Sequence, residues 1–425
     1  MVGGSRTRLL LILVILLTPS LIVGMLHTNT PVNSESFYIA QTANWLMGWQ
    51  NRKAHAVSGS AGAGTDYQIK IVVHRSTGTD SGENVFVGTN CRVDFGDIRF
   101  TDDNGTTQLD YWLEESDTSH AVFWVEVRDD LDTDQSIYIY YGNSEASSAS
   151  DGDSTFIFFD DFDDESIDIS KWSVHGPWLE TGGVASFSIA GDGGMSILPS
   201  LRTDDTWDMQ NKSITSSWRV NEMTVNREWG VSCADTSADD HTRMAYFLAF
   251  NTTTTNNVRS YFDVNSATGY DHSEPIIGQY IPSTFMITEF VSTPDAITKN
   301  KWILDGEIVD IFSTYSFDMT PQYIFLGFYV FGYNNTLISG QLEMEFDYVY
   351  LRNHIGSEPS HASWGVEESP STSSTSPSPG PYGIDSWMIL MIAGGGGAVA
   401  LIVLVLVFVR SNRRGGGSVQ TPYEW

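Results

Sequence analysis

The sequence is poor in cysteine and in basic residues. Only two cysteines, Cys91 and Cys233, occur in 425 residues, which excludes a disulfide-dense scaffold and a four-cysteine zinc site. The two thiols either form one disulfide or stay reduced and buried, and the sequence leaves both open. With 22 basic against 53 acidic residues, the formal charge of −31 argues against a general nucleic-acid binder, which needs positive charge to meet phosphates.

Familiar catalytic motifs are also missing. The sequence has no HExxH metal motif, no GxSxG nucleophile turn, no P-loop and no CxxC pair. Hydrophobic residues nevertheless make up 41% of the chain and charged residues only 18%, so the chain can bury cores and is unlike a disordered acidic chain. Its length suits two folded domains with accessory segments.

Two uncharged apolar runs lie near the ends of the chain. Two arginines precede the first run, which predicts an export signal or an uncleaved signal anchor in residues 1–26. The second run, residues 387–409, is long enough for a transmembrane helix at ~1.5 Å per residue. Three arginines follow it, so the positive-inside rule places the tail, residues 410–425, in the cytoplasm. We therefore expect a single-pass protein of the cell membrane with its folded part outside.

The part placed outside carries features of a surface glycoprotein. Residues 369–383 are rich in Ser, Thr and Pro, which favours an extended stalk because such a segment cannot bury apolar surface. Asn-x-Ser/Thr sequons are the candidate glycosylation sites, although a chain rich in these residues also produces such triplets by chance. The sequons start at Asn104, Asn211, Asn251 and Asn334.

Apolar and polar residues alternate in many short runs between the two membrane-directed ends. The run from Tyr67 to His74 shows the period-two pattern of a half-buried strand, and Asp305 with the glycine after it is typical of a tight hairpin turn. No long amphipathic helix pattern interrupts these runs. We expect an all-β fold of two tandem β-sandwich (jelly-roll) domains, residues 45–155 and 156–366, followed by one transmembrane helix.

A series of motifs in fixed order lies between Asp97 and Phe162: DIRF, L-x-Y-W, W-V-x-V, Y-x-Y-Y-G-N and F-x-D-D-F. This series resembles an uncharacterised β-domain family of archaeal and bacterial secreted proteins, which typically precedes a concanavalin A-like jelly roll; the likeness extends back to about Trp45. The later motifs DDFDDESIDISKW, KWILDGEIV and EFDYVYLRN are similar to the opening, middle hairpin and closing strand of laminin-G or concanavalin A-like domains. The resemblance implies a sugar-binding module or a glycoside hydrolase.

Glycosidases of the concanavalin A-like fold place two glutamates around an aspartate on one strand. The nearest match is Glu343, Glu345 and Asp347, whose spacing puts the three carboxylates on one face of a strand. The order is Glu-Glu-Asp instead of Glu-Asp-Glu, and the strand closes the domain instead of lying in its middle. We therefore expect no enzyme, with a membrane-tethered glycoside hydrolase as the alternative.

Structural calcium is the other chemistry that the resemblance implies. The first and last strands of such jelly rolls are usually neighbours, so Asp160 or Asp161 is expected to meet Asp347 and hold the ion. The alternative is that these acids cap strand ends or face solvent. The oxygen-rich segment from Thr101 to Gly105 lacks the glutamate that completes an EF-hand loop, so we interpret it as a turn.

Tryptophans in polar surroundings are the candidate ligand-binding residues. Trp178, Trp207 and Trp229 would stack on sugar rings if exposed, and the alternative is that they belong to a β core. We expect a non-catalytic recognition protein that binds a glycan or surface polymer in adhesion or envelope structure. A purely structural envelope component is a further alternative.

Overall fold

The computed structural model describes residues 44–225, 229–235, 243–251, 255–266, 269–273, 275–292, 300–312, 322–328 and 336–370. The predicted export signal, the transmembrane helix, the tail and nearly all of the stalk lie outside the described residues. Within the described ranges, no helix is long and apolar enough to cross a membrane. Residues Ala40–Thr372 form one structural unit, which holds both sandwiches.

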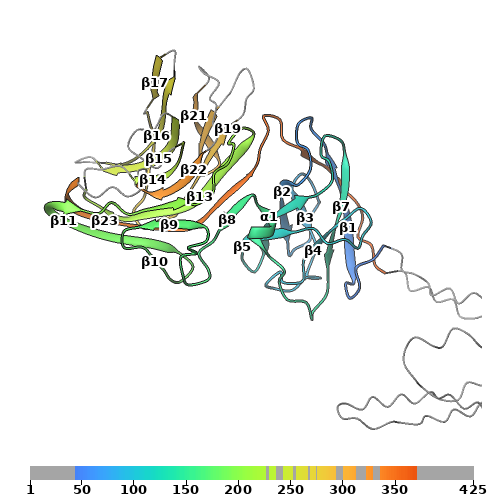
Figure 1. Ribbon diagram of the computed structural model, residues 1–425. Helices are drawn as coiled ribbons and strands as arrows, with labels where there is room; N and C mark the ends of the chain where they lie inside the picture. Colours follow the sequence, from blue (N-terminus) through green and yellow to red (C-terminus); the bar gives the residue numbers. More distant parts are fainter. Residues whose placement is uncertain are drawn as a thin grey trace, which may run out of the picture. The chain divides into compact units, whose positions relative to one another are not determined.

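The described chain folds almost entirely as β-strands, with one short helix, α1 (Gly152–Thr155) (Figure 1). The prediction of an all-β fold built from sandwiches is confirmed. Alternating burial explains why: in β2, Ile69, Ile71 and Val73 point into a core while Lys70 and His74 are only partly buried.

The first sandwich consists of two four-stranded sheets, with the strand orders β24-β1-β7-β4 and β3-β2-β6-β5. Both sheets bury one apolar face in a common core. The strands are β1 (Asn51–Ser58), β2 (Tyr67–His74), β3 (Asn84–Phe86), β4 (Arg99–Asp102), β5 (Tyr111–Ser116), β6 (His120–Val127), β7 (Gln135–Tyr141) and β24 (Ser360–Trp364).

One strand of the first sandwich comes from the far end of the described chain. We assigned residues 156–366 to the jelly roll, yet β24 pairs antiparallel with β1. Arg52 and Glu368 extend this pairing through two backbone hydrogen bonds and an ion pair of 2.7 Å. The second sandwich is therefore inserted between β7 and β24, and the chain leaves toward the stalk from the first sandwich.

The second sandwich contains two eight-stranded sheets packed over one core. The β23 sheet has the order β10-β11-β23-β13-β19-β20-β21, with β8 also paired to β23, and the β14 sheet has the order β17-β16-β15-β14-β22-β12-β9, with β18 also paired to β16. Strands of the β23 sheet are β8 (Phe158–Asp160), β10 (Leu179–Glu180), β11 (Ala185–Ser196), β13 (Lys212–Met223), β19 (Met286–Ser292), β20 (Asn300–Leu304), β21 (Glu307–Phe312) and β23 (Thr336–Asn353). Those of the β14 sheet are β9 (Trp172–His175), β12 (Ser200–Thr203), β14 (Trp229–Ala234), β15 (Arg243–Asn251), β16 (Asn256–Ser266), β17 (Gly269–Ser273), β18 (Ile276–Gln279) and β22 (Tyr323–Gly327).

A separate aromatic cluster joins the two sandwiches. Trp112 of β5 meets the rings of Phe159 and Tyr348 edge-on, with centroid distances of 5.0 and 5.1 Å. Phe156 stacks on Tyr350 at 4.3 Å. Each such pair adds about 1 kcal/mol to the burial of its rings. The cluster therefore holds the outer face of the β23 sheet against β5 and β6.

Candidate functional site

The three candidate tryptophans lie in the second sandwich. Trp229 is fully buried and Trp178 is 8% exposed, so neither ring offers a face to a sugar. Trp207 is half-buried and packs against the same core, with its ring 5.1 Å from that of Phe158. The core alternative therefore applies to Trp178 and Trp229, and the structure does not bring the three rings together as one platform.

The strands that carry the predicted calcium ligands Asp160 and Asp347 are neighbours, because Asp160 on β8 pairs with Val349 on β23. Both oxygens of Asp160 are engaged, one by the Trp172 indole at 2.6 Å and the other by the Phe162 amide at 3.0 Å. In the part of the chain that the structure describes, no three His, Cys, Asp or Glu side chains are grouped as metal ligands. Asp160, Asp161 and Asp347 thus do not form a ligand set, and calcium stays a prediction from the resemblance, which a chelator that leaves Tm unchanged would contradict.

The candidate glycosylation sites are described only in part. Asn104 is exposed in a turn, where its side-chain oxygen accepts the amides of Thr106 and Thr107, each at 2.8 Å. Asn211 is half-buried, while Asn334 lies outside the described residues and no side-chain description covers Asn251. Glycosylation stays a prediction.

Both cysteines are buried as free thiols, each in a different sandwich. Burial raises the pKa of Cys91 to about 11 and that of Cys233 to about 12, so both stay protonated at neutral pH. The buried-thiol alternative holds, and neither is a reactive site.

The row of acids on β23 lies as the sequence predicts. Glu343, Glu345 and Asp347 share the outer face of the β23 sheet, because Leu342, Met344 and Phe346 between them are fully buried. The Asn221 amide donates to Glu345 at 2.7 Å and reaches Glu343 at 3.4 Å. Arg219 Nε binds Glu345 at 2.8 Å, and the Asp347 carboxylate accepts from Ser217 at 3.1 Å.

A cavity of about 500 Å³ adjoins this row, between the outer face of the β23 sheet and strands β2, β5 and β6. We call it the inter-sandwich cavity. Its aromatic lining comes from both sandwiches and consists of Trp124, Phe285, Tyr348 and Tyr350. Its ionisable lining consists of Lys70, Glu114, Glu115, Glu289, Asp305 and Asp347. The cavity thus combines ring surface with many hydrogen-bonding groups.

Burial sets the electrostatics of this cavity. Burial raises the pKa of Glu114, although its oxygens accept from the Tyr348 hydroxyl at 2.8 Å and the Trp124 indole at 3.1 Å. Burial also raises the pKa of Asp347, with help from the like charges of Asp163 and Asp161. The site is therefore one where further negative charge is costly.

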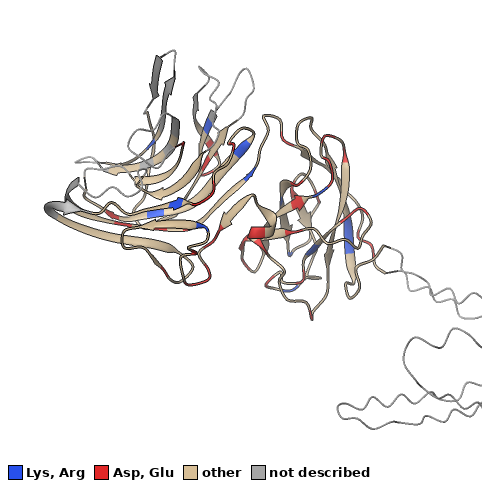
Figure 2. Cartoon of the chain, viewed as in Figure 1, with Lys and Arg blue, Asp and Glu red and all other residues tan. Residues whose placement is uncertain are grey.

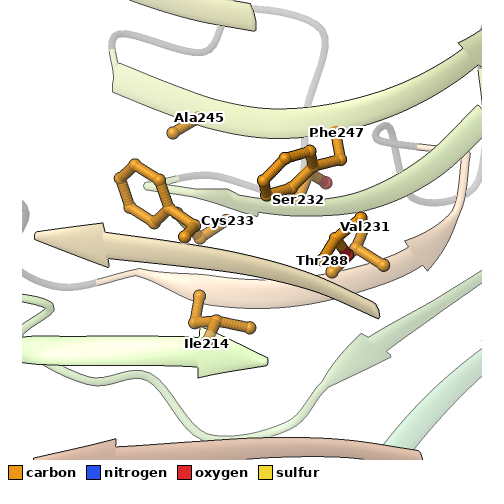
Figure 3. A pocket seen from close by; sticks show the side chains of 8 residues that line it. Ile214, Val231, Ser232, Cys233, Ala245, Phe247 and Thr288 are labelled. Carbon is orange, nitrogen blue, oxygen red and sulfur yellow. The ribbon is translucent and has the colours of Figure 1, made fainter. Parts of the chain in front are cut away.

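A second cavity, of about 10 Å³, lies inside the core of the second sandwich (Figure 3). Figure 3 shows Ile214 of one sheet and Val231, Cys233 and Phe247 of the other around it. A space of this size holds at most about one water molecule, so it is a packing gap and not a ligand site.

The sequence missed the first-sandwich half of the inter-sandwich cavity. Glu114 and Glu115 come shortly after the L-x-Y-W motif, and Trp124 is the first residue of W-V-x-V. Cavity residues therefore lie in or next to two of the motifs that carry the resemblance. Their period-two pattern gave only the strand. The hydrogen bond between Glu114 and Tyr348, which are more than two hundred residues apart, gave no signal in the sequence.

Comparison with known proteins gives a family match for one part of the chain. Residues 94–175 match the family described as "Domain of unknown function (DUF2341)". This agrees with the predicted resemblance to an uncharacterised β-domain family, although the match begins later than Trp45 and extends past Phe162. A search of curated proteins found no match.

Solved structures similar to the chain include three carbohydrate-related proteins. LamAcat from Zobellia galactanivorans has a TM-score of 0.36 and 10% identity over 47% of this chain and 97% of its own. A β-1,3-glucanase from Mycobacterium marinum has a TM-score of 0.33 and 10% identity, over 46% of this chain and 98% of its own. The κ-carrageenase from Pseudoalteromonas carrageenovora was solved with a κ-carrageenan oligotetrasaccharide. It has a TM-score of 0.34 and 11% identity, over 46% of this chain and 92% of its own. These matches contradict our expectation that the chain is not an enzyme.

Proposed function

We propose that the protein is a membrane-anchored surface protein that engages a glycan in the inter-sandwich cavity. The observation that carries the proposal is this cavity, whose volume of about 500 Å³ lies in the range of small-ligand sites. Sugars are bound by aromatic rings together with carboxylates and hydroxyls, and the cavity supplies both kinds of group. The predicted export signal, stalk and transmembrane helix would present it outside the cell.

The lining residues divide these tasks. Trp124 and Phe285 are half-buried, with the Arg352 guanidinium 5.0 Å from the Trp124 ring centroid and the Arg219 guanidinium 4.3 Å from that of Phe285. A sugar would therefore meet the parts of the two rings that these arginines leave exposed. Thr215 lies in the lining beside Tyr350 and is buried, so it shapes the cavity wall. Ser217 and Asp347 lie at the side of the cavity that continues into the acid row.

Binding is tested with the full chain in detergent on a glycan array. Ile287 lines the cavity and is 40% exposed, so Ile287→Arg should fill the entrance and abolish binding. The matched control is Ile308→Arg on β21, which is 54% exposed and does not line the cavity. Loss of binding in both variants, or in neither, would contradict the proposed location.

Hydrolysis of a glycan is the second candidate function. The observation that favours it is that Glu343 and Glu345 share one face and one amide, that of Asn221. A glycosidase needs two carboxyl groups about 5 Å apart in a retaining enzyme, or about 6.5–9.5 Å apart in an inverting one. In this proposal one glutamate protonates the leaving oxygen and the other acts as nucleophile or base.

Hydrolysis is tested by the release of reducing ends from polysaccharides. Glu343→Gln and Glu345→Gln should each remove such activity by at least about a hundredfold, since each deletes an acid–base or nucleophilic group. Glu307→Gln, at an exposed position on β21, is the control. Activity that survives both row variants would exclude these glutamates as the catalytic pair.

A further inference from the structure

The inter-sandwich cavity is strongly asymmetric in charge. Its lining contains five carboxylates and a single ammonium group, that of Lys70. Figure 2 shows acidic residues spread over both sandwiches, with few basic ones. The cavity is thus a place where this general excess of acid is gathered around a recess that is partly open to solvent, in which charges are screened less than on a flat surface.

Protein cations neutralise only part of this charge. Arg352 Nη2 binds Glu289 Oε1 at 3.0 Å, and Glu114 is held by neutral donors, the Tyr348 hydroxyl and the Trp124 indole. Asp305 accepts the Ile287 amide at 2.9 Å, which is also a neutral donor. Negative charge therefore remains on the cavity wall from both sandwiches.

The rim of the cavity is where a ligand would meet this charge first. Glu115 on β5 and Asp305 in the β20–β21 turn are both exposed, one on each sandwich. Asp347, by contrast, is only partly exposed. A ligand that spans the cavity would pass between acids on two sides.

Resting on the proposed function, we infer that the cavity selects glycans that carry protonated amino groups and rejects glycans that carry carboxylate or sulfate groups. An ammonium group between Glu115 and Asp305 gains favourable charge interactions, whereas an anionic unit adds repulsion to an already acidic wall. In this proposal the sugar ring itself meets the exposed parts of Trp124 and Phe285, beside the guanidinium groups of Arg352 and Arg219. Charge on the ligand therefore sets selectivity, and ring contact sets basal affinity.

The test compares oligosaccharides of one length on the full chain in detergent, by calorimetry. The probes are a β-1,4-linked glucosamine hexamer, its N-acetylated form and a galacturonic acid hexamer. We expect the glucosamine hexamer to bind at least about tenfold more tightly than the N-acetylated form, and the uronic hexamer not to bind. The preference should shrink in 0.5 M salt, where the screening length falls to a few ångströms (about 4 Å).

Two variants locate the preference. Glu115→Gln and Asp305→Asn keep the shape of each side chain and remove its charge, and Asp305→Asn also suits the positive φ of 48° at that position. Each should lower binding of the glucosamine hexamer three- to tenfold and lower binding of the N-acetylated hexamer much less. The control Glu307→Gln, which is exposed next to the same turn but does not line the cavity, should change neither.

The outcomes separate this inference from the proposed function. Equal binding of all three hexamers, or tighter uronic binding, overturns the selectivity while the glycan site stands, provided that Ile287→Arg abolishes it. Binding of none of the hexamers overturns the selectivity, and it overturns the glycan site as well if the array is also empty. Spermidine that binds as tightly as the glucosamine hexamer would show that the amine alone is recognised, which contradicts glycan selection.

Discussion

The two sandwiches use their ionisable residues differently. The first sandwich contains a buried carboxylate that is fully engaged: Asp97 is 1% exposed and accepts three backbone amides, those of Arg92, Gly142 and Asn143. In the second, the acids of β23 stay on the outer face while the core behind them is apolar and aromatic. The buried Asp97 carboxylate therefore stabilises the first sandwich, whereas the β23 acids lie on an outer face, where polar side chains such as Arg219 and Ser217 bind them.

The two sandwiches also differ in how they are attached to the rest of the chain. The first sandwich binds β24 and the segment just before the stalk, for example through the backbone hydrogen bonds and the ion pair between Arg52 and Glu368. The second is attached by the aromatic cluster and by the two chain crossings at Phe158 and Asn353. The second sandwich is inserted into the chain of the first, and the inter-sandwich cavity lies between them.

Core packing gives the largest expected effect, in the second sandwich. Trp229→Ala should lower the free energy of unfolding by about 3–5 kcal/mol, because a fully buried indole is replaced by a cavity. Chemical denaturation measures the loss, and Trp207→Ala, at a half-buried position, should cost less. An unchanged stability with loss of glycan binding would instead make Trp229 a ligand residue.

Removal of a buried charge gives the next effect, in the first sandwich. Asp97→Ala should cost about 3 kcal/mol, since three amides lose a charged acceptor. Asp94→Ala is the control, because that carboxylate is 58% exposed and its ion pair with Arg92 lies at the surface. A cost for Asp97→Ala below that of Asp94→Ala would show that the buried Asp97 carboxylate does not stabilise the first sandwich.

The first sandwich should also make the free energy of unfolding depend on pH. Burial, with the nearby His361, lowers the pKa of His55 to about 3, so the folded state keeps this ring neutral while the unfolded chain takes up a proton near pH 6.5. Stability from this group is thus present above about pH 6.5 and falls as the pH drops toward 3, by about 3 kcal/mol at pH 4. Denaturation of His55→Gln and of the parent chain between pH 4 and 7 measures the difference, and parallel curves would contradict it.

The smallest effect is expected where the chain leaves the first sandwich. Glu368→Ala should cost less than about 1 kcal/mol, because the Glu368 side chain is 43% exposed and solvent weakens its pair with Arg52. The backbone bonds of the same residue remain. A loss of several kcal/mol would show that this pair, and not the β24–β1 pairing, holds the C-terminal segment.

Local patterns predicted local structure well. The alternation from Tyr67 to His74 forms β2, and the expected turn at Asp305 and Gly306 has positive φ at both residues, 48° and 83°, between β20 and β21. The row of acids on β23 also follows directly from the period of a strand. Each of these predictions needs only a residue and its near neighbours in the chain.

Local patterns did not predict which tryptophans are buried, nor that β24 pairs with β1 of the first sandwich. Polar neighbours of Trp229 suggested exposure, but its strand lies in the middle of the β14 sheet, where its ring is covered by Phe187 and Phe328. The β24 strand falls after the last jelly-roll strand, so sequence order alone assigned it to the wrong sandwich.

The sequence by itself determined the all-β character, the strand positions and the acidic balance, because these depend on composition and on a two-residue period. Only the tertiary structure decided that the second sandwich is an insertion and that Glu114 and Tyr348 meet at one cavity. The physical reason is that such contacts depend on the packing of whole sheets, and many packings are compatible with the same alternating strands.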